Sequence, residues 1–118
     1  MADSIFARII NGEIPTEFIY EDEHCVAIHD INPQAPTHVL VIPRRPIEKL
    51  SDAGPQDQEL LGHLLLVVAK VAEQLGVADA FRLIVNNGAN AGQTVFHLHL
   101  HIVAGRSFKE GQLTGGLN

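Results

Sequence analysis

The sequence predicts a single α+β domain, with a mostly antiparallel sheet of about five strands, one long helix and one short helix. Its 118 residues suit one hydrophobic core, and 46% of them are apolar, close to the share in an ordinary globular protein. Short apolar segments bounded by glycine, proline and aspartate occur beside only two helical patterns. The sequence contains no internal repeat and no linker composition, so we expect one domain over residues 1–118.

The N-terminal part of the chain predicts a short helix and three strands. Ser4 is a suitable N-cap for a helix over Ile5–Ile10, and Gly12 would end that helix because glycine readily adopts the left-handed conformation. Apolar and β-branched segments between turn residues predict strands at residues 18–21, 25–30 and 38–42. Asp22-Glu23 fits a hairpin turn between the first two strands.

A long helix is predicted by the apolar period between residues 51 and 76. Ser51 or Asp52 is the expected N-cap, and Pro55 fits the first turn. Gly76 suits the left-handed position after the last turn. The apolar residues of this segment are Leu60, Leu61, Leu64, Leu65, Leu66, Val67, Val68, Val71, Ala72 and Leu75. They cover most of the helix circumference, so we expect a second copy of the chain to cover one side in a homodimer, the alternative being a helix covered entirely by its own sheet.

Two strands are predicted after the long helix, at residues 81–86 and 94–104, with a glycine-containing loop at 87–93 between them. The second strand is apolar at every other position from residue 96 to 102, which is the pattern of a strand with one buried face. The glycine-rich tail at 111–118 is expected to be mobile.

Composition excludes several classes of partner. The chain has 8 Lys and Arg against 14 Asp and Glu, a net charge of −6, which argues against nucleic-acid binding. The longest apolar run, 64–69, is far shorter than the ~20 residues that cross a bilayer, and the first residues do not resemble a signal peptide. We therefore expect no membrane association and a cytoplasmic location. The one cysteine, Cys25, excludes an intramolecular disulfide and a cysteine-cluster zinc site, and we expect it to pack as a small hydrophobe in a strand.

Three histidines alternate with apolar residues in the last predicted strand: His97, His99 and His101. Successive side chains of a strand point to opposite faces, so the three imidazoles should form a row on one face, roughly 6.5–7 Å apart. Folding requires an apolar row on the buried face but not three aligned imidazoles on the other. The row therefore predicts a working surface.

Three interpretations of this row are open. It can bind a metal ion, with a further ligand such as His38 or Asp30 from another strand. It can carry chemistry on phosphorus, because an imidazole held through its second nitrogen by a carbonyl is a nucleophile and its neighbours can stabilise phosphate oxygens. It can also be a polar outer face without a task. The preceding loop, 86–94, contains small residues that let backbone N–H groups approach an anion, which favours a phosphate pocket.

Taken together, these segments resemble the histidine triad family. The run His97-Leu-His99-Leu-His101-Ile-Val fits the family pattern His-φ-His-φ-His-φ-φ, in which φ is apolar. Segments at 5–15, 29–38, 61–64 and 86–94 resemble the Hint branch, so the resemblance covers nearly the whole chain. It implies a homodimeric HIT-like fold and a purine nucleoside phosphoramidase. Such an enzyme releases AMP or GMP and an amine through a nucleotidyl-histidine, without a cofactor.

The resemblance implies a role for each residue that matches a family motif. His99 would be the nucleophile, His97 would orient it through its backbone carbonyl, and His101 would contact the phosphate oxygens. His38 would support proton handling, and Asp30 would accept hydrogen bonds from the ribose hydroxyls. The positions that match a phosphate or leaving-group site are Asn86, Gly92, Gln93 and Thr94. The positions that match the apolar slot for the base are Ile5, Phe6, Ile9, Ile28 and Ile31.

Departures from the family pattern leave other functions open. The cysteine pairs that bind structural zinc in some relatives are absent, so no structural zinc is expected, and the tryptophan-bearing tail of the animal branch is replaced by residues 113–118. His63 has no motif role and is expected on the helix surface or at the dimer contact. The rival functions are a dinucleoside polyphosphate hydrolase, a nucleotide-binding or scaffold protein with little turnover, and a zinc-binding protein built on His97, His99 and His38.

Overall fold

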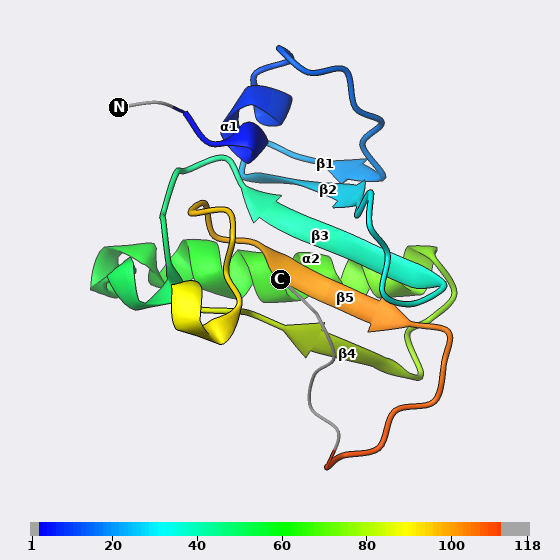
Figure 1. Cartoon of the computed structure of the whole chain (residues 1–118). Helices are drawn as coiled ribbons and strands as arrows, with labels where there is room; N and C mark the ends of the chain where they lie inside the picture. Colours follow the sequence, from blue (N-terminus) through cyan, green and yellow to red (C-terminus); the bar gives the residue numbers. More distant parts are fainter. Residues whose placement is uncertain (1–2, 112–118) are drawn as a thin grey trace.

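A computed structural model describes residues 3–111 of the chain (Figure 1). Within them one antiparallel sheet has the strand order β1-β2-β3-β5-β4. The strands are β1 (Tyr20–Glu21), β2 (Cys25–His29), β3 (Thr37–Pro43), β4 (Phe81–Ile84) and β5 (Leu100–Ala104). The helices are the short α1 (Ile5–Ile10) and the long α2 (Gln58–Gln74), so the predicted α+β fold is confirmed. The tail that the sequence predicts to be mobile lies outside the described residues from position 112 onward.

The two helices pack on opposite faces of the sheet. Strand β3 explains this arrangement because its side chains alternate: Val39 and Val41 belong to the core that contains α2, whereas Leu40 and Ile42 belong to the core that contains α1. In Figure 1, α2 passes behind β3 and β5. The α2 residues buried in its core are Leu64, Val67, Val68 and Val71. Since both faces of β3 are covered, the strand is apolar at nearly every position.

The long helix begins later than the sequence predicts. Two 3₁₀ turns, Leu50–Asp52 and Pro55–Asp57, precede α2, so neither Ser51 nor Asp52 is its N-cap. The physical reason is Pro55, which forces the residue before it, Gly54, into an extended conformation and prevents a continuous helix through this point. At the other end Gly76 has a φ of 75°, the left-handed value that the sequence predicts.

Strand β5 is also shorter than predicted. A strand from residue 94 is wrong, because β5 begins at Leu100 and residues 94–99 form no ladder. The chain leaves the sheet here because its hydrogen-bonding groups have other partners. The N–H of Leu98 donates to the carbonyl of Ile47 at 2.7 Å, and the carbonyl of Pro43, the last residue of β3, bonds to the ring of His97. Only His101 of the three alternating histidines therefore lies in a strand.

One side of α2 remains uncovered within the chain. Leu65 and Leu66 are 55% and 71% exposed, although both are large apolar side chains. The alternative that the sheet of the same chain covers the whole helix is therefore wrong. The expected homodimer would cover these leucines, and it stays a prediction.

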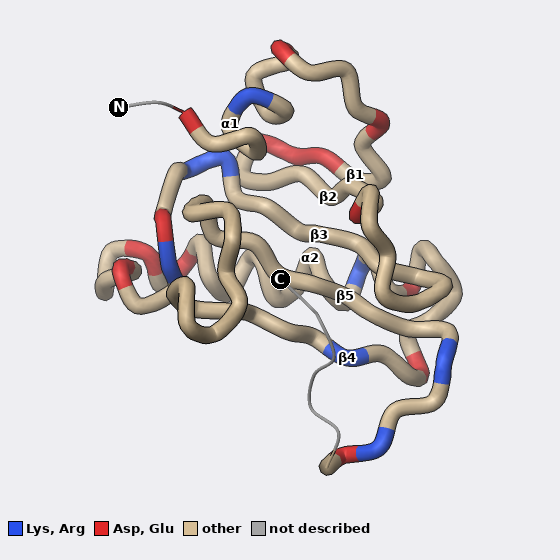
Figure 2. Tube along the Cα trace, in the orientation of Figure 1, with Lys and Arg blue, Asp and Glu red and all other residues tan. Residues whose placement is uncertain are grey.

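The two central strands, β3 and β5, contain no lysine, arginine, aspartate or glutamate. Figure 2 shows β3 and β5 in tan along their length, with lysine, arginine, aspartate and glutamate in the surrounding segments. At the end of β3, Arg44 pairs with Glu21 at 2.9 Å, and Arg45 pairs with Asp57 at 3.2 Å. Among the described residues, no helix is long and apolar enough to span a bilayer.

Candidate active site

The histidines predicted to act together lie together on the α1 side of the sheet. His38 comes from β3 and His101 from β5, while His97 and His99 come from the segment just before β5. The ring centroids of His99 and His101 are 5.0 Å apart, and those of His38 and His101 are 5.2 Å apart. All four residues are at most 5% exposed, so the protein shields the histidines from bulk solvent.

His99 is held by the backbone of His97. The Nδ1 atom of His99 lies 2.8 Å from the His97 carbonyl oxygen. A carbonyl oxygen only accepts, so Nδ1 carries the proton, and the neutral ring has its lone pair on Nε2. The ring of Phe6 from α1 stands edge-on to His99 at 4.9 Å between centroids and limits its rotation. His99 is thus fixed in the tautomer that a nucleophile at Nε2 requires.

His97 lies behind the row, and both of its ring nitrogens have protein partners. Nε2 donates to the Pro43 carbonyl at 2.7 Å, which leaves Nδ1 to accept the hydroxyl proton of Ser4 at 2.9 Å. Burial lowers the pKa of His97, and the nearby His99 adds to this effect, while the bond to Pro43 opposes it. The role of Ser4 as a partner of His97 was missed by sequence reasoning, which identified Ser4 only as the N-cap of α1.

His38 and His101 form a directed pair. The backbone N–H of Gln34 donates to Nδ1 of His38 at 3.0 Å, so neutral His38 carries its proton on Nε2. That Nε2 lies 2.9 Å from Nδ1 of His101 and 3.4 Å from a carboxylate oxygen of Asp30. Burial lowers the pKa of His38, although Asp30 opposes the shift. Nδ1 of His101 accepts the hydrogen bond from Nε2 of His38. Neutral His101 therefore carries its own hydrogen on Nε2, and this N–H can donate to an anion.

A pocket of about 260 Å³ opens beside His99 and His101. The predicted site residues that line it with these two are Ile5, Phe6, Ile9, Ile28, Asp30, Ile31 and Thr94. Sequence reasoning missed four further lining residues: His29, Asn32, Leu40 and Val95. Leu40 follows from strand alternation, since it lies two positions after His38 in β3 and faces the same side. The pocket joins an apolar slot to the row of imidazoles.

Three predicted phosphate residues lie outside the lining of this pocket: Asn86, Gly92 and Gln93. The buried amide of Gln93 holds the loop together instead. Its Oε1 accepts from the N–H of Gly88, and its Nε2 donates to the carbonyls of Glu48 and Val95. Gly92 has a φ of 101° and ends the short turn Ala89–Ala91. The amide of Gln93 thus has backbone partners, and its expected place at a phosphate or leaving-group site stays a prediction.

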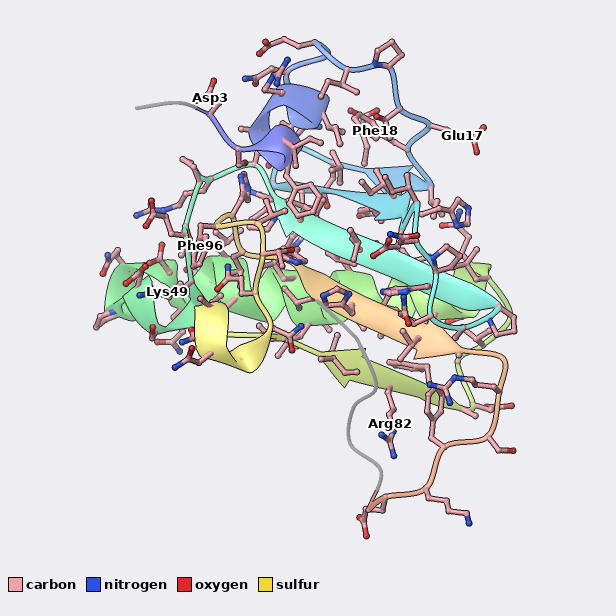
Figure 3. The ribbon with its side chains drawn as sticks, in the orientation of Figure 1. Asp3, Glu17, Phe18, Lys49, Arg82 and Phe96 are labelled. Carbon is pink, nitrogen blue, oxygen red and sulfur yellow. The ribbon has the colours of Figure 1, made fainter. Side chains whose placement is uncertain are left out.

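A smaller hollow of about 170 Å³ lies on the far side of His97. It is lined by Asp3, Ser4, Ala7, Pro46, Glu48, Phe96 and His97. Figure 3 labels Asp3 before α1 and Phe96 on the segment that leads to β5. Solvent therefore approaches the Ser4–His97 contact from outside the main pocket.

The described residues include one group at this site with the geometry to hold a metal ion: Asp30, His38 and His101, whose ligand atoms lie within 4.8 Å of one another. The zinc site considered for His97, His99 and His38 is not assembled. His97 faces Ser4 and Pro43 with its two nitrogens, and Nδ1 of His99 faces a carbonyl. Instead, the oriented imidazole of His99 and the N–H donor of His101 lie beside the apolar part of the pocket.

Comparison with known proteins gives a consistent result. Residues 11–108 match the family model described as HIT domain. The chain is 59% identical over 106 residues to an uncharacterised HIT-like protein of Synechocystis sp., covering 90% of this chain and 93% of the relative. It is 50% identical over 105 residues to an uncharacterised HIT-like protein of Synechococcus elongatus, covering 89% and 92%.

Solved structures share the fold. A HIT family hydrolase from Clostridium thermocellum has a TM-score of 0.89 and 43% identity, covering 92% of this chain and 96% of that one. A HIT family hydrolase from Legionella pneumophila has a TM-score of 0.88 and 38% identity, covering 92% and 97%. A histidine triad nucleotide-binding protein from Candida albicans has a TM-score of 0.77 and 33% identity, covering 85% and 73%.

Proposed function

The chain belongs to the histidine triad (HIT) family, and from this we propose that it hydrolyses the P–N bond of purine nucleoside 5′-phosphoramidates. The products are AMP or GMP and an amine. The solved relatives named as HIT family hydrolases support a hydrolase, and the geometry around His99 supports the narrower reaction.

The observation that carries this function is the fixed tautomer of His99. Its Nε2 lone pair attacks phosphorus and forms an N–P bond while the P–N bond to the amine breaks, and the amine leaves with a proton taken from solvent, which the attacking water returns in the next step. Water then attacks the same phosphorus, the His99 bond breaks, and the nucleoside monophosphate is released. Neutral His99 needs no base to remove a proton from Nε2, because the His97 carbonyl keeps the proton on Nδ1.

Charge on the phosphate oxygens has a matching donor. The pair His38–His101 directs a proton to Nε2 of His101, and His101 lines the pocket next to His99. A donor that is oriented before the reaction stabilises developing negative charge without reorganising in the transition state. Loss of His38 should therefore reduce turnover through the orientation of His101.

The rest of the pocket suits a nucleoside. Ile5, Phe6, Ile9, Ile28 and Ile31 offer an apolar slot for a purine ring. Asp30 lies at the polar side of this slot, where one carboxylate oxygen accepts from the N–H of Asn32 at 2.8 Å. A partly exposed carboxylate at this point is a suitable acceptor for ribose hydroxyls.

A homodimer is part of the same proposal. Leu65 and Leu66 are exposed on α2, the helix that covers one face of the sheet. Leu83 of the edge strand β4 is 37% exposed as well. Exposed leucines of this kind mark an interaction surface, and among the described residues β4 is an edge strand whose backbone can pair with a second copy. A cytoplasmic location likewise remains a prediction from the sequence.

One experiment tests the function directly. Chelator-treated protein without a histidine tag is incubated with adenosine 5′-phosphoramidate, quenched early, and the intact chain is weighed by mass spectrometry while released AMP is measured. We expect an AMP adduct on the wild type and none on His99→Ala, which should also lose AMP release. AMP release by His99→Ala at the wild-type rate would exclude the covalent route.

The same assay separates the rival functions. A dinucleoside polyphosphate is offered in place of the phosphoramidate, at equal concentration. Faster release of AMP from the dinucleotide would favour the polyphosphate hydrolase. AMP binding without release from either substrate would favour a nucleotide-binding or scaffold protein.

A further inference from the structure

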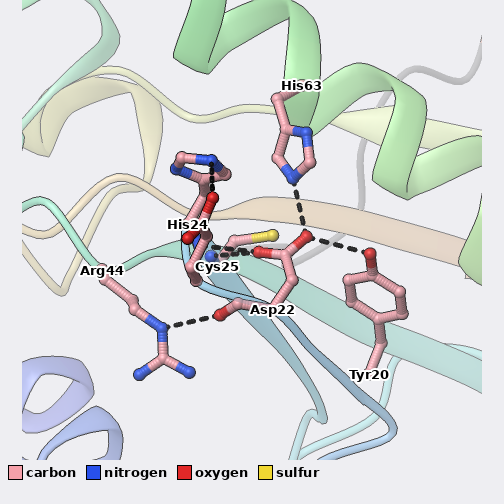
Figure 4. A network of polar contacts seen from close by, with 7 residues as sticks. Tyr20, Asp22, His24, Cys25, Arg44 and His63 are labelled. Atoms are coloured by element: carbon pink, nitrogen blue, oxygen red, sulfur yellow. Dashed lines mark hydrogen bonds and ion pairs between the residues drawn. The ribbon is translucent and has the colours of Figure 1, made fainter.

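A second cluster of reactive side chains lies on the other side of the sheet from the histidine row. It joins the β1–β2 turn to α2 and contains Asp22, Cys25 and His63, with Tyr20 and His24 beside them (Figure 4). One ligand atom from each of Asp22, Cys25 and His63 lies within 4.8 Å of the other two. The proposed hydrolysis uses none of these residues.

The carboxylate of Asp22 is the centre of the cluster. Its Oδ1 accepts from the backbone N–H groups of His24 at 2.7 Å and Cys25 at 2.9 Å, which fixes its direction. Its Oδ2 accepts from the hydroxyl of Tyr20 at 2.9 Å and lies 2.7 Å from Nε2 of His63. Burial would raise the pKa of Asp22, but these hydrogen bonds outweigh it and hold the pKa well below its usual value. The carboxylate is therefore an anion that converges on a histidine nitrogen.

Cys25 supplies the sulfur on the remaining side. It is the first residue of β2 and is completely buried, and Figure 4 shows its sulfur beside the Asp22 carboxylate. Burial raises the pKa of the thiol to about 12, with the Asp22 carboxylate adding to the shift. Without a cation the cysteine therefore stays a thiol. A cation between sulfur and carboxylate reverses this, since a metal-bound thiol loses its proton.

His63 approaches from the helix. It lies in the first half of α2, where its side chain is 33% exposed while that of Asp22 is 21% exposed. The ring of His24 stands 4.9 Å from the ring of His63 on the solvent side. Two of the three ligand residues thus border solvent, from which an ion and a water ligand can reach the cluster.

We propose that Asp22, Cys25 and His63 form a binding site for Zn²⁺, with water in the fourth position. The donor set is one thiolate, one imidazole and one carboxylate, which are the three ligand types that zinc accepts in proteins. On binding, the Cys25 thiol loses its proton to solvent, and the hydrogen on Nε2 of His63 is transferred through solvent to Nδ1 of the same neutral ring, so that Nε2 offers its lone pair. Bonds from the metal to the Cys25 sulfur, the His63 nitrogen and the Asp22 carboxylate replace the S–H bond and the hydrogen bond.

The required movement is small. A tetrahedral zinc ion holds nitrogen and oxygen ligands about 3.3 Å apart, so the 2.7 Å contact must open by roughly half an ångström. His63 has the freedom to do this because its side chain reaches the solvent at the helix surface. The turn itself is held in place by Arg44, whose Nε donates to the Asp22 carbonyl at 2.9 Å. Metal binding would therefore fasten the β1–β2 edge of the sheet to α2.

The sequence alone predicts no structural zinc, because it has only one cysteine. That reasoning considered only pairs of cysteines. This site combines Cys25 with Asp22, 25 − 22 = 3 positions before it, and with His63, 63 − 25 = 38 positions after it. Such spacing becomes a ligand set only when the hairpin and the helix are packed together.

The test uses the full chain without a histidine tag, stripped with a chelator and titrated with CoCl₂ and then with ZnCl₂. Co²⁺ bound to a thiolate gives a charge-transfer band in the near ultraviolet. Cys25 is the only cysteine in the chain, so this band reports binding at this site. We expect one Co²⁺ per chain with this band, displaced by one Zn²⁺. We also expect the melting temperature to rise with ZnCl₂, since an ion that binds only the folded state stabilises it.

Three variants locate the site. Cys25→Ser should remove the charge-transfer band, and His63→Gln and Asp22→Asn should weaken Zn²⁺ binding by more than about 100-fold, since loss of an outer partner of a ligand alone costs roughly 10–100-fold. His63→Gln keeps a partly exposed helix position polar and retains an amide donor beside Asp22, so it should stay folded in chelator with only a small fall in melting temperature. This variant decides the outcome if Cys25→Ser does not fold.

Two controls distinguish this site from other histidine clusters. His29→Gln removes an exposed histidine at the far end of β2 and should leave Zn²⁺ affinity unchanged. His101→Gln removes a member of the Asp30–His38–His101 group and should also leave the cobalt band unchanged. Absence of the band in the wild type, an intact band in His63→Gln, or loss of binding only in His101→Gln would each overturn the proposal.

Discussion

The hydroxyl of Ser4 lies 2.9 Å from Nδ1 of His97, and the same oxygen accepts the N–H of Ala7 at 3.0 Å. One side chain therefore caps the first turn of α1 and also holds a buried histidine that comes 93 positions later. Because the carbonyl of His97 in turn orients His99, the start of α1 is connected to the proposed nucleophile through two hydrogen bonds.

Ser4→Ala should therefore affect both stability and catalysis. Loss of the cap costs about 1 kcal/mol, and an unpaired buried nitrogen on His97 costs about 1–3 kcal/mol. We expect a free energy of unfolding lower by about 2–4 kcal/mol in urea and a reduced kcat, with KM little changed. Ser4→Thr keeps the hydroxyl and should behave like the wild type. Equal urea midpoints for Ser4→Ala and the wild type would show that the bond to His97 contributes nothing.

Stability should fall in mildly acidic buffer. Burial lowers the pKa of both His38 and His97 from the ordinary value of 6.5. Between the lowered values and 6.5 the unfolded chain binds more protons than the folded chain, so the free energy of unfolding falls as the pH drops below about 6.5. Urea unfolding from about pH 7 to about pH 5 isolates this effect, since carboxylates titrate mainly below that range. His38→Asn should flatten part of the slope, and a flat wild-type curve would contradict the assignment.

Ile31 separates binding from folding. It is 96% exposed yet lines the pocket, so its side chain is available to a bound base. Ile31→Ala should leave the melting temperature unchanged and weaken AMP binding by roughly fivefold, because partial burial of its methyl groups is worth about 1 kcal/mol. Calorimetric titration with AMP measures the effect. Leu50→Ala, at an exposed leucine outside the pocket, is the control, and an equal loss in both variants would exclude the proposed slot.

Leu66→Glu tests the dimer. Leu66 is 71% exposed in the single chain, so a charge there costs the monomer little, whereas it would be desolvated in an interface through α2. Light scattering during gel filtration should give a dimer for the wild type and a monomer for this variant. Gln58→Glu adds the same charge at the exposed start of α2 and should remain dimeric. A monomeric wild type would rule the dimer out.

Gly105 should tolerate no side chain. Its φ is 92°, and a Cβ there would lie 2.9 Å from Cβ of Pro36, in the loop that precedes β3. Gly105→Ala is expected to lower the free energy of unfolding by about 2 kcal/mol or more in urea. Gly62→Ala, in α2 with nothing within 4 Å of the added atom, should instead gain up to about 1 kcal/mol. The opposite order of the two variants would contradict the contact with Pro36.

The periodic features of the fold could be predicted from the sequence. The cap at Ser4, the period of α2 and the left-handed Gly76 each depend on a few neighbouring residues, so local rules were sufficient. The start of α2 was missed because the effect of Pro55 on Gly54 outweighs the capping potential of Ser51. The late start of β5 was missed because its cause, the bond from Leu98 to Ile47, joins segments that are 98 − 47 = 51 positions apart.

The candidate site shows the same division. His99, His101 and the apolar slot follow from alternation and motif, and the structure places them around one pocket. Gln93 matches a phosphate or leaving-group position, which stays a prediction, whereas no sequence pattern reveals that its amide bonds to three backbone groups. The convergence of Asp22 with His63 was missed for a similar reason, since it depends on how the β1–β2 turn packs against α2.

The late start of β5, at Leu100, has a consequence for the nucleophile. Carbonyl groups inside a ladder are occupied by the adjacent strand, and those of β5 are distributed between β3 and β4. His97 lies three residues before the ladder begins, so its carbonyl is available to a side chain instead. The position at which β5 begins therefore determines which ring nitrogen of His99 carries the hydrogen. A substitution that extended the pairing of β3 and β5 toward residue 97 would change the reactive edge of the imidazole without touching the imidazole itself.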